Sequence, residues 1–175
     1  VGQGVRTMKE LFARERGGIP IAVVSDPSKV EFCTNLGAKG VINRKEFDHW
    51  GRLPDFDDSA AYAKWNQGVR AFGKKFWEVL GERRSPKIVF EHSGMATLPT
   101  SMFMCDNGGM VVICGGTSGY NGGIDLGFLW MRSKRLQGSH FASTRECSEL
   151  NRLVDSGRID PCLSHCADFK QIAQV

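Results

Sequence analysis

Short apolar runs alternate with amphipathic segments along most of the chain. The runs predict buried strands over 19–24, 41–43, 87–90 and 110–114, with a final strand over 135–141. Apolar residues at helical spacing predict helices over 5–16, 27–36, 61–80, 95–105 and 143–156. Because continuous apolar strands are each followed by a helix, the pattern predicts an α/β fold. In it, a doubly wound parallel sheet carries helices on both faces. Because no strand precedes the first predicted helix, we expect this sheet to be incomplete at its N-terminal side, with one central edge unpaired.

Capping residues and glycines set the expected boundaries. Ser25 or Asp26 can cap the second helix through a side-chain oxygen. Gly68 and Gly73 fall inside the helical pattern of 61–80, which weakens the prediction of one unbroken helix there. No internal repeat or composition change divides the chain, so we expect a single domain over residues 1–175. The longer loops are predicted over 44–60 and 115–127.

Composition narrows the class of protein. Of 175 residues, 41% are hydrophobic and 24% charged, the balance of a soluble globular domain. The chain has 23 Lys and Arg against 19 Asp and Glu, scattered without a dense basic stripe, so we expect no nucleic-acid partner. No apolar run reaches the ~20 residues of a membrane span, so we expect no membrane partner. Six cysteines without a disulfide framework and no visible signal peptide favour the cytoplasm.

The carboxyl ends of the strands are where a doubly wound sheet binds ligands. Ser25 and Lys29 follow the strand over 19–24, and Arg44 follows the strand over 41–43. Hydroxyl and basic groups there favour the extra phosphate of NADP. Asp26 offers an alternative, since a carboxylate at this place reads the ribose of NAD. The simplest alternative is a helix cap flanked by solvated bases.

Other strand ends carry further candidates, each with a purely structural alternative. His92 follows the strand over 87–90 and could position a ligand, or serve only as a hydrogen-bonded structural residue. The loop from Gly115 to Tyr120 lets backbone N–H groups approach a ligand, or is a flexible crossover. The segment from Gly138 to Phe141 lies beside a strand end, or packs its aromatic ring into the core.

Two weaker signals lie near the chain ends. Gly2 and Gly4 precede the first predicted helix, where a phosphate-binding glycine loop belongs, but Thr7 stands at the third glycine position. Cys162, His165 and Cys166 could offer metal ligands. No second ligand pair stands at zinc-site spacing, so we expect no metal. The chain starts with Val1, and we expect it to be a piece of something longer.

Several motifs in order resemble the crotonyl-CoA carboxylase/reductase family of the medium-chain dehydrogenase/reductase superfamily. The similarity extends over about residues 17–164 and is most specific around His92 and over Trp130–Phe141. The motifs are Ile19-Pro-Ile-Ala-Val-Val-Ser25, Glu31–Ala38, Ile42-Asn43-Arg44, Val89-Phe-Glu-His-Ser-Gly94, Thr117-Ser-Gly-Tyr120, Leu129-Trp-Met-Arg-Ser-Lys-Arg-Leu-Gln-Gly-Ser-His-Phe-Ala142 and Ile159-Asp-Pro-Cys-Leu-Ser164.

The resemblance implies a Rossmann-like NADP-binding domain and NADPH-dependent reduction of an α,β-unsaturated acyl-CoA. Hydride goes to the β-carbon, and carbon dioxide captures the enolate at the α-carbon, so crotonyl-CoA would give ethylmalonyl-CoA. By the same resemblance, His92 helps to hold carbon dioxide. The implied cofactor contacts are Gly2, Gly4, Ser25, Lys29, Arg44, Gly115, Thr117, Ser118, Gly119, Ser139 and Phe141.

The chain also departs from the family. Ser93 stands where proline usually follows the histidine, so we expect a less rigid loop. The GroES-like catalytic half, with most of the acyl-CoA pocket, is absent, so we expect the isolated fragment to be inactive. A non-carboxylating enoyl-thioester or quinone-type reductase and a catalytically empty nucleotide-binding module are the alternatives. We expect the full enzyme to be a homo-oligomer.

Overall fold

A computed structural model describes residues 10–162 and 168–171, in which strands alternate with helices as expected. Residues 10–15 are helical, and the rest of the helix predicted over 5–16 lies outside the described residues. The strands are β1 (Ile21–Val24), β2 (Gly40–Asn43), β3 (Ile88–Glu91), β4 (Met110–Ile113) and β5 (Arg135–Gly138). The helices are η1 (Pro27–Lys29), α2 (Val30–Asn35), η2 (Arg44–Glu46), α3 (Ser59–Leu80), α4 (Leu98–Met104), α5 (Leu126–Trp130), α6 (Thr144–Asp155) and η3 (Phe169–Gln171).

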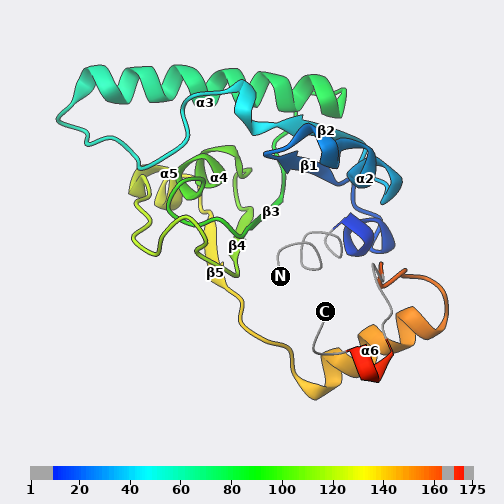
Figure 1. The fold of residues 1–175 in the computed structure, drawn as a ribbon. Coiled ribbons are helices and arrows are strands. Elements are labelled where there is room, and N and C mark those ends of the chain that lie inside the picture. The colour runs from blue at the N-terminus through cyan, green and yellow to red at the C-terminus, as the bar shows by residue number, and fades with distance from the viewer. Residues whose placement is uncertain (1–9, 163–167, 172–175) are drawn as a thin grey trace.

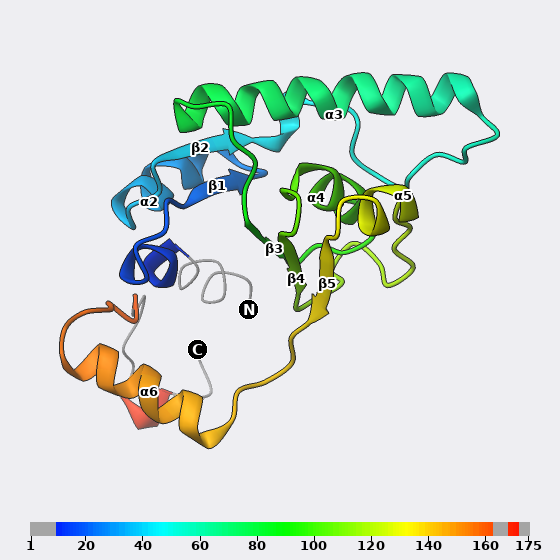
Figure 2. The ribbon, with the colours of Figure 1, turned by 180° about the vertical axis from the view of Figure 1, so that it is seen from behind.

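All the described strand pairs are parallel, and the strands form two sheets. β1 pairs with β2, placing Ile21 opposite Gly40. β4 lies between β3 and β5, and Val111 pairs with Val89 on one side and Leu136 on the other. Figures 1 and 2 show the two sheets side by side, with α3 running across both. The parallel α/β class predicted from the sequence is confirmed.

The β1–β2 sheet has helices on both faces. On one face, Ala22 and Val24 pack with Cys33 of α2. On the other, Ile42 packs with Phe72 and neighbouring apolar residues of α3. This sheet therefore has the doubly wound arrangement that its continuous apolar strands predict.

The β3–β5 sheet has a helical cover on one face only within the described residues. Val89 and Val111 face a cluster built with Leu98 and Met102 of α4. The alternate residues of β3 face the other way: Ile88 is 68% exposed and Phe90 41% exposed. Within the described residues the predicted helical cover is therefore seen on one face of this sheet, and α6 lies apart from it (Figure 1).

The two described sheets are separate, in line with the expectation that a central edge of the parallel sheet lacks its strand. Doubly wound dinucleotide-binding sheets have the strand order 3-2-1-4-5-6. The pair β2–β1 and the trio β3–β4–β5 match the outer parts of that order. No strand in the described part of the chain stands between β1 and β3, so no backbone ladder joins the sheets.

Helix α3 is continuous despite its two glycines. Asp58 begins it by accepting a hydrogen bond from the Ala61 N–H at 2.9 Å. A Cβ atom on Gly68 would lie 2.5 Å from the Cβ of His49, so this glycine allows close packing onto the preceding loop. The loss of helix propensity is offset by burial of one face of a 22-residue helix.

Two elements differ from the sequence prediction near the glycine-rich segment. Helix α5 falls partly inside the loop predicted over 115–127, and Asp125 caps it through the N–H groups of Gly127 and Phe128. Strand β5 ends at Gly138, three residues before its predicted end at Phe141. Phe141 is 90% exposed and has a positive φ of 55°, so it extends no strand and packs into no core.

Candidate functional site

The carboxyl end of β3 carries a buried carboxylate that holds the following turn. Glu91 Oε1 accepts hydrogen bonds from the N–H groups of Ser93 at 2.8 Å and Gly94 at 3.0 Å. It also accepts from the Thr97 hydroxyl at 2.7 Å, and Oε2 accepts from the Ser101 hydroxyl at 2.5 Å. A carboxylate satisfied by so many donors is stable when buried. The turn that carries His92 is therefore tied to the start of α4.

A second loop, which follows β4, locks onto this turn. The Ser118 N–H and hydroxyl both donate to the Ser93 carbonyl, at 2.8 and 2.7 Å. The same hydroxyl accepts from the Ala96 N–H at 2.9 Å. A Cβ atom on Gly94, which has a φ of +85°, would lie 2.8 Å from the Gly119 carbonyl oxygen. Only glycine allows the two backbones to come so close.

His92 lies where these two loops meet. A Cβ atom on Gly115 would lie 2.9 Å from the His92 carbonyl oxygen and 3.2 Å from ring atom Cδ2, so the imidazole lies against the backbone of the second loop. The ring is half-buried and lines a cavity. An imidazole held in this way can hydrogen-bond a ligand in the cavity without changing its own position.

The end of β1 supplies a second polar region. Asp26, not Ser25, caps η1, because its carboxylate accepts from the Ser28 N–H at 3.0 Å. That backbone hydrogen bond, followed by the Ser28 side chain and the charge of Lys29, lowers the pKa of Asp26. The carboxylate is therefore ionised and engaged at the cap. This favours the hydroxyl and basic groups over Asp26 as ligand contacts.

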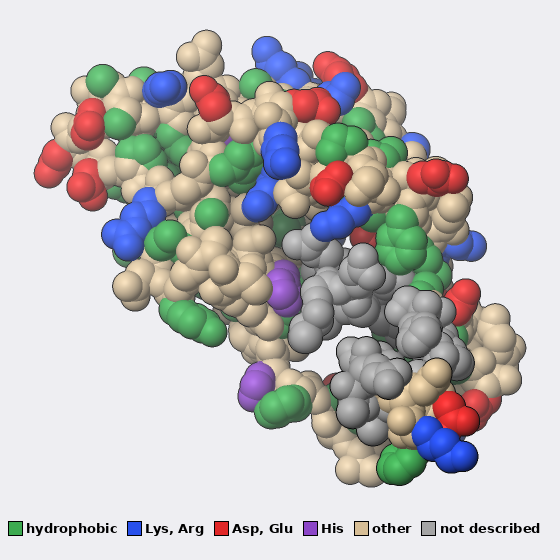
Figure 3. Space-filling view, in the orientation of Figure 1, with side chains coloured by type: hydrophobic (Ala, Val, Ile, Leu, Met, Phe, Trp, Pro, Cys, Tyr) green, Lys and Arg blue, Asp and Glu red, His purple; other side chains and the backbone are tan. Residues whose placement is uncertain are grey.

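The two polar regions line one cavity of about 740 Å³ between the sheets. The predicted residues Ser25, Lys29, Arg44 and His92 all lie on its wall. Its volume falls within the usual range of small-molecule sites, about 300–1,000 Å³. Lys and Arg side chains lie beside the β1–β2 sheet on this face, interspersed with Asp and Glu side chains (Figure 3). The cavity can thus take an elongated anionic ligand with one end near the bases and the other near His92.

The remaining predicted contacts have different positions. Gly115 touches His92, while Ser118 and Gly119 hold the loops together as described above. Thr117 is exposed beside them. Ser139 and Phe141 are exposed beyond β5 and are not on the cavity wall. Gly2 and Gly4 lie outside the described residues.

Sequence reasoning missed several contributors to the site. Glu91 and Ser28 both line the cavity, yet the sequence points to Glu91 only as part of the motif Val89–Gly94 and to Ser28 only as part of the helix predicted over 27–36. Phe72 and Phe76 of α3 line the cavity, although their spacing indicates nothing beyond a helix core. An acidic residue directly after a buried strand was the available signal for Glu91, since a buried carboxylate requires several partners.

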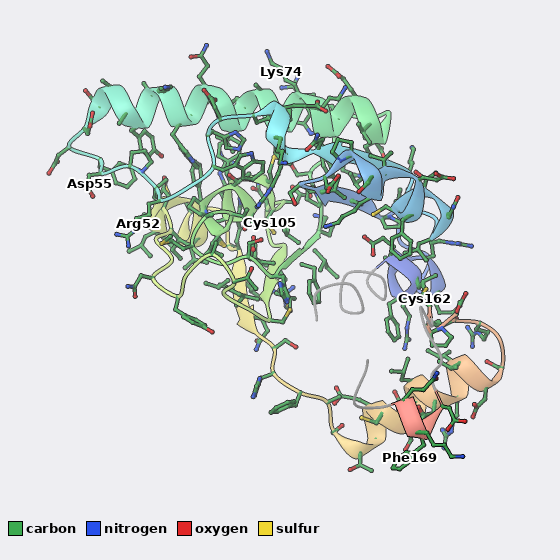
Figure 4. The ribbon with its side chains drawn as sticks, in the orientation of Figure 1. Arg52, Asp55, Lys74, Cys105, Cys162 and Phe169 are labelled. Atoms are coloured by element: carbon green, nitrogen blue, oxygen red, sulfur yellow. The ribbon has the colours of Figure 1, made fainter. Side chains whose placement is uncertain are left out.

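The described residues hold no group of three or more His, Cys, Asp or Glu side chains that could bind a metal. His165 and Cys166 lie outside the described ranges. Cys162 lies on the side of the molecule that carries α6 and Phe169, away from Cys105 beneath α3 (Figure 4). Within the same ranges, no helix is long and apolar enough to cross a membrane.

These features define a Rossmann-like nucleotide-binding domain: a parallel α/β fold with polar groups at adjacent strand ends and a glycine-rich loop after β4. The family model described as zinc-binding dehydrogenase matches residues 4–156. The chain belongs to that family. The resemblance to crotonyl-CoA carboxylase/reductases found in the sequence is also confirmed by individual relatives.

The crotonyl-CoA carboxylase/reductase of Cereibacter sphaeroides is 46% identical over 156 residues, which is 89% of this chain and 36% of the relative. The crotonyl-CoA reductase of Streptomyces collinus is 36% identical over 174 residues, which is 98% of this chain and 37% of the relative. The solved structure of the crotonyl-CoA carboxylase/reductase AntE in complex with NADP is 61% identical, with a TM-score of 0.93. The match covers 98% of this chain and 42% of AntE. The chain thus spans less than half the length of these relatives.

Proposed function

We propose that this chain is the cofactor-binding part of an NADPH-dependent enoyl-CoA carboxylase/reductase. The observation that carries the proposal is the single cavity that joins Ser25, Lys29 and Arg44 to His92. Its support from relatives is that AntE was solved with NADP, and that the 2-octenoyl-CoA carboxylase reductase CinF was solved with NADP and 2-octenoyl-CoA. CinF is 36% identical to this chain, with a TM-score of 0.81.

The proposed reaction uses the two ends of the cavity differently. Lys29 and Arg44 bind the 2′-phosphate of the cofactor through charge-assisted hydrogen bonds, and Ser25 adds a hydroxyl. NADPH, when bound, supplies a hydride to the β-carbon of the enoyl thioester. His92 holds carbon dioxide beside the α-carbon, which takes it up as the new carboxylate. Crotonyl-CoA would then give ethylmalonyl-CoA. The steps proposed for this chain use no bound metal.

We also propose where the acyl-CoA pocket lies, how the full enzyme assembles and where it is found. The acyl-CoA pocket would lie in a GroES-like catalytic half outside this chain, and the whole would be a homo-oligomer in the cytoplasm. The outer edge of β5 supports self-association, because no described strand pairs with it. We propose acyl-CoA, carbon dioxide and NADP as the ligands of the full enzyme, and we propose neither a nucleic acid nor a membrane as a partner.

Cofactor discrimination tests the proposal. Replacing Lys29 or Arg44 with alanine removes a charged donor, which is worth about 1.5–3 kcal/mol, so we expect the Kd for NADPH to rise about 10- to 100-fold. The Kd for NADH, which lacks the phosphate, should change less than about threefold. Calorimetry at fixed moderate salt measures both. Lys74→Ala is the matched control, because Lys74 is an exposed base on α3 (Figure 4). Equal losses for NADPH and NADH would contradict the phosphate assignment.

Product analysis separates carboxylation from simple reduction. Full-length enzyme supplied with crotonyl-CoA, NADPH and bicarbonate should form ethylmalonyl-CoA, whereas a non-carboxylating reductase forms only butyryl-CoA. Mass spectrometry of the acyl-CoA products distinguishes the two. Butyryl-CoA as the sole product at saturating bicarbonate would support the alternative reductase.

A further inference from the structure

The buried carboxylate beneath His92 carries an inference that deepens the proposed function and rests on it. We propose that Glu91 is a positioning residue for His92: it fixes the imidazole in the cavity by clamping the turn on which the histidine stands. Glu91 is 4% exposed, and its two carboxylate oxygens accept four hydrogen bonds from residues 93–101. His92 lies in the chain between Glu91 and Ser93, whose N–H donates to the Glu91 carboxylate.

The hydrogen bonds act on both sides of the imidazole-bearing residue. The bond from the Ser93 N–H to the Glu91 side chain closes a small ring over His92, at 2.8 Å. The bonds from Thr97 and Ser101 anchor the same carboxylate to α4. The Glu91 side chain therefore holds the backbone on both sides of His92. Without these hydrogen bonds, a turn of the same length would let the imidazole ring point in several directions.

The same geometry excludes a direct chemical role for Glu91. An ionised carboxylate has about four lone-pair positions. Here Oε1 accepts three hydrogen bonds and Oε2 accepts a bond of 2.5 Å from the Ser101 hydroxyl. A general acid or base needs a free position facing the reacting proton. Both carboxylate oxygens of Glu91 are engaged in holding the turn and the start of α4, so we assign it a role through His92.

Ser93 gives the clamp a particular function in this chain. Proline, usual at this place in the resembling family, fixes φ but has no N–H group. Ser93 has an N–H, which donates to Glu91, and its carbonyl accepts from Ser118. The expected loss of rigidity at residue 93 is therefore compensated by hydrogen bonds. In this chain the direction of the imidazole depends on the carboxylate more than in a sequence with proline.

A double-mutant cycle tests whether Glu91 acts through His92. In the full-length enzyme, Glu91→Leu and His92→Asn should each raise the KM for carbon dioxide about tenfold and increase the share of butyryl-CoA. The double variant should be no worse than His92→Asn alone. Glu91→Gln should stay within about threefold of the wild type, because its carbonyl oxygen replaces Oε1 as acceptor. Val69→Ala, a buried change in α3, controls for general destabilisation.

Two results would overturn the role assigned to Glu91. If Glu91→Leu and His92→Asn have additive effects, or if Glu91→Gln is as impaired as Glu91→Leu, the proposal is overturned. Thr97→Val provides a second test if Glu91→Leu does not fold, since it removes one donor and keeps the carboxylate. It should raise the KM for carbon dioxide about threefold in the wild-type background and leave it unchanged in His92→Asn.

A readout without catalysis separates this inference from the proposed function. Amide hydrogen exchange over residues 92–97 should be about tenfold faster in Glu91→Leu and unchanged in Val69→Ala, measured by mass spectrometry. If the wild-type enzyme does not carboxylate, the proposed function fails while the exchange data still report on the clamp. Unchanged exchange in Glu91→Leu would overturn the clamp whatever the product.

Discussion

His49 is a buried imidazole among aromatic rings, just under α3. Its ring centroid lies 4.4 Å from that of Trp50 and 5.8 Å from that of Phe72. Neither ring nitrogen has a hydrogen-bond partner among the described residues. Burial lowers the pKa of His49, and the charge of Asp48 only partly opposes this. The side chain is therefore neutral in the fold, and a proton added to it would be a buried charge without a partner.

We expect this histidine to make the domain acid-sensitive. The unfolded chain takes up a proton near pH 6.5 and the folded protein only at lower pH, so the stability present above pH 6.5 is lost as the pH falls. One group contributes at most about 1.4 kcal/mol per pH unit. His49→Phe should reduce this dependence between pH 7 and pH 5, measured by urea unfolding. A wild-type slope retained in the variant would contradict the assignment.

The sequence predicted those residues of the candidate site that come directly after a strand. Ser25, Lys29, Arg44 and His92 share a cavity wall because the carboxyl ends of parallel strands meet at one edge of the fold. The function of Glu91 was not predictable, because it depends on a turn that brings donors from α4 back to the strand end. Ser139 and Phe141 stay predictions, because they follow the end of β5 and do not line this cavity.

At the scale of elements, Lys134 ends helix α4. Lys134 is 6% exposed, and its ammonium group donates to the carbonyls of Met102 at 2.6 Å and Phe103 at 3.1 Å. These carbonyls belong to the last turn of the helix, where no backbone N–H reaches them. Burial lowers the pKa of Lys134 to about 8. The helix end is thus satisfied by a base that is still mostly charged at pH 7 and loses its charge as the pH rises through about 8.

This cap predicts a stability that increases with pH. Between pH 7 and pH 9 the folded protein releases a proton from Lys134 that the unfolded chain keeps, so the unfolding free energy rises by on the order of 1 kcal/mol. Lys134→Met should abolish that rise. At pH 7 it should also cost about 1–3 kcal/mol, because two carbonyls lose their donor. Lys74→Met serves as the exposed control, and a pH slope unchanged in Lys134→Met would contradict the prediction.

Element prediction succeeded where the chain is strongly periodic. β1, β2, β3 and β4 each lie within two residues of the predicted bounds, because they are apolar runs closed by turn residues. Helix α5 was missed because five residues with glycine at the second position show no period, and its start depends on the Asp125 cap. The continuity of α3 was underestimated, since the partner that requires glycine at position 68 is distant in sequence.

At the scale of the whole molecule, the order of elements predicted the fold class and an unpaired central edge, but not which strands lie side by side. Strand pairing is a long-range property, and nothing in the local pattern of β1 or β3 records which strand lies beside it. The division leaves several sheet edges without a described partner, among them the outer edge of β5. Such edges readily pair with another chain.

We expect self-association through the β5 edge. The N–H groups of Arg135 and Ser139 point to β4, so that of Leu136 points outward. Leu136→Pro removes this outward donor and leaves the donors to β4 in place. The variant should sediment mainly as monomer, whereas Leu136→Ala, which keeps the N–H, should associate like the wild type. An unchanged sedimentation coefficient in Leu136→Pro would show that another surface forms the contact.

Helix α3 has a kinetic consequence for whatever enters the cavity. It packs against β1, β2 and α4, and its residues Phe72 and Phe76 form part of the cavity wall. One continuous helix therefore bridges the two sheets within the described residues, and we expect their spacing to change little when a ligand enters. Uptake of a nucleotide should follow a single exponential whose rate grows linearly with concentration, without the plateau that a slow closing step produces. The domain would behave as a fixed cradle, leaving any slow gating of turnover to other parts of the enzyme.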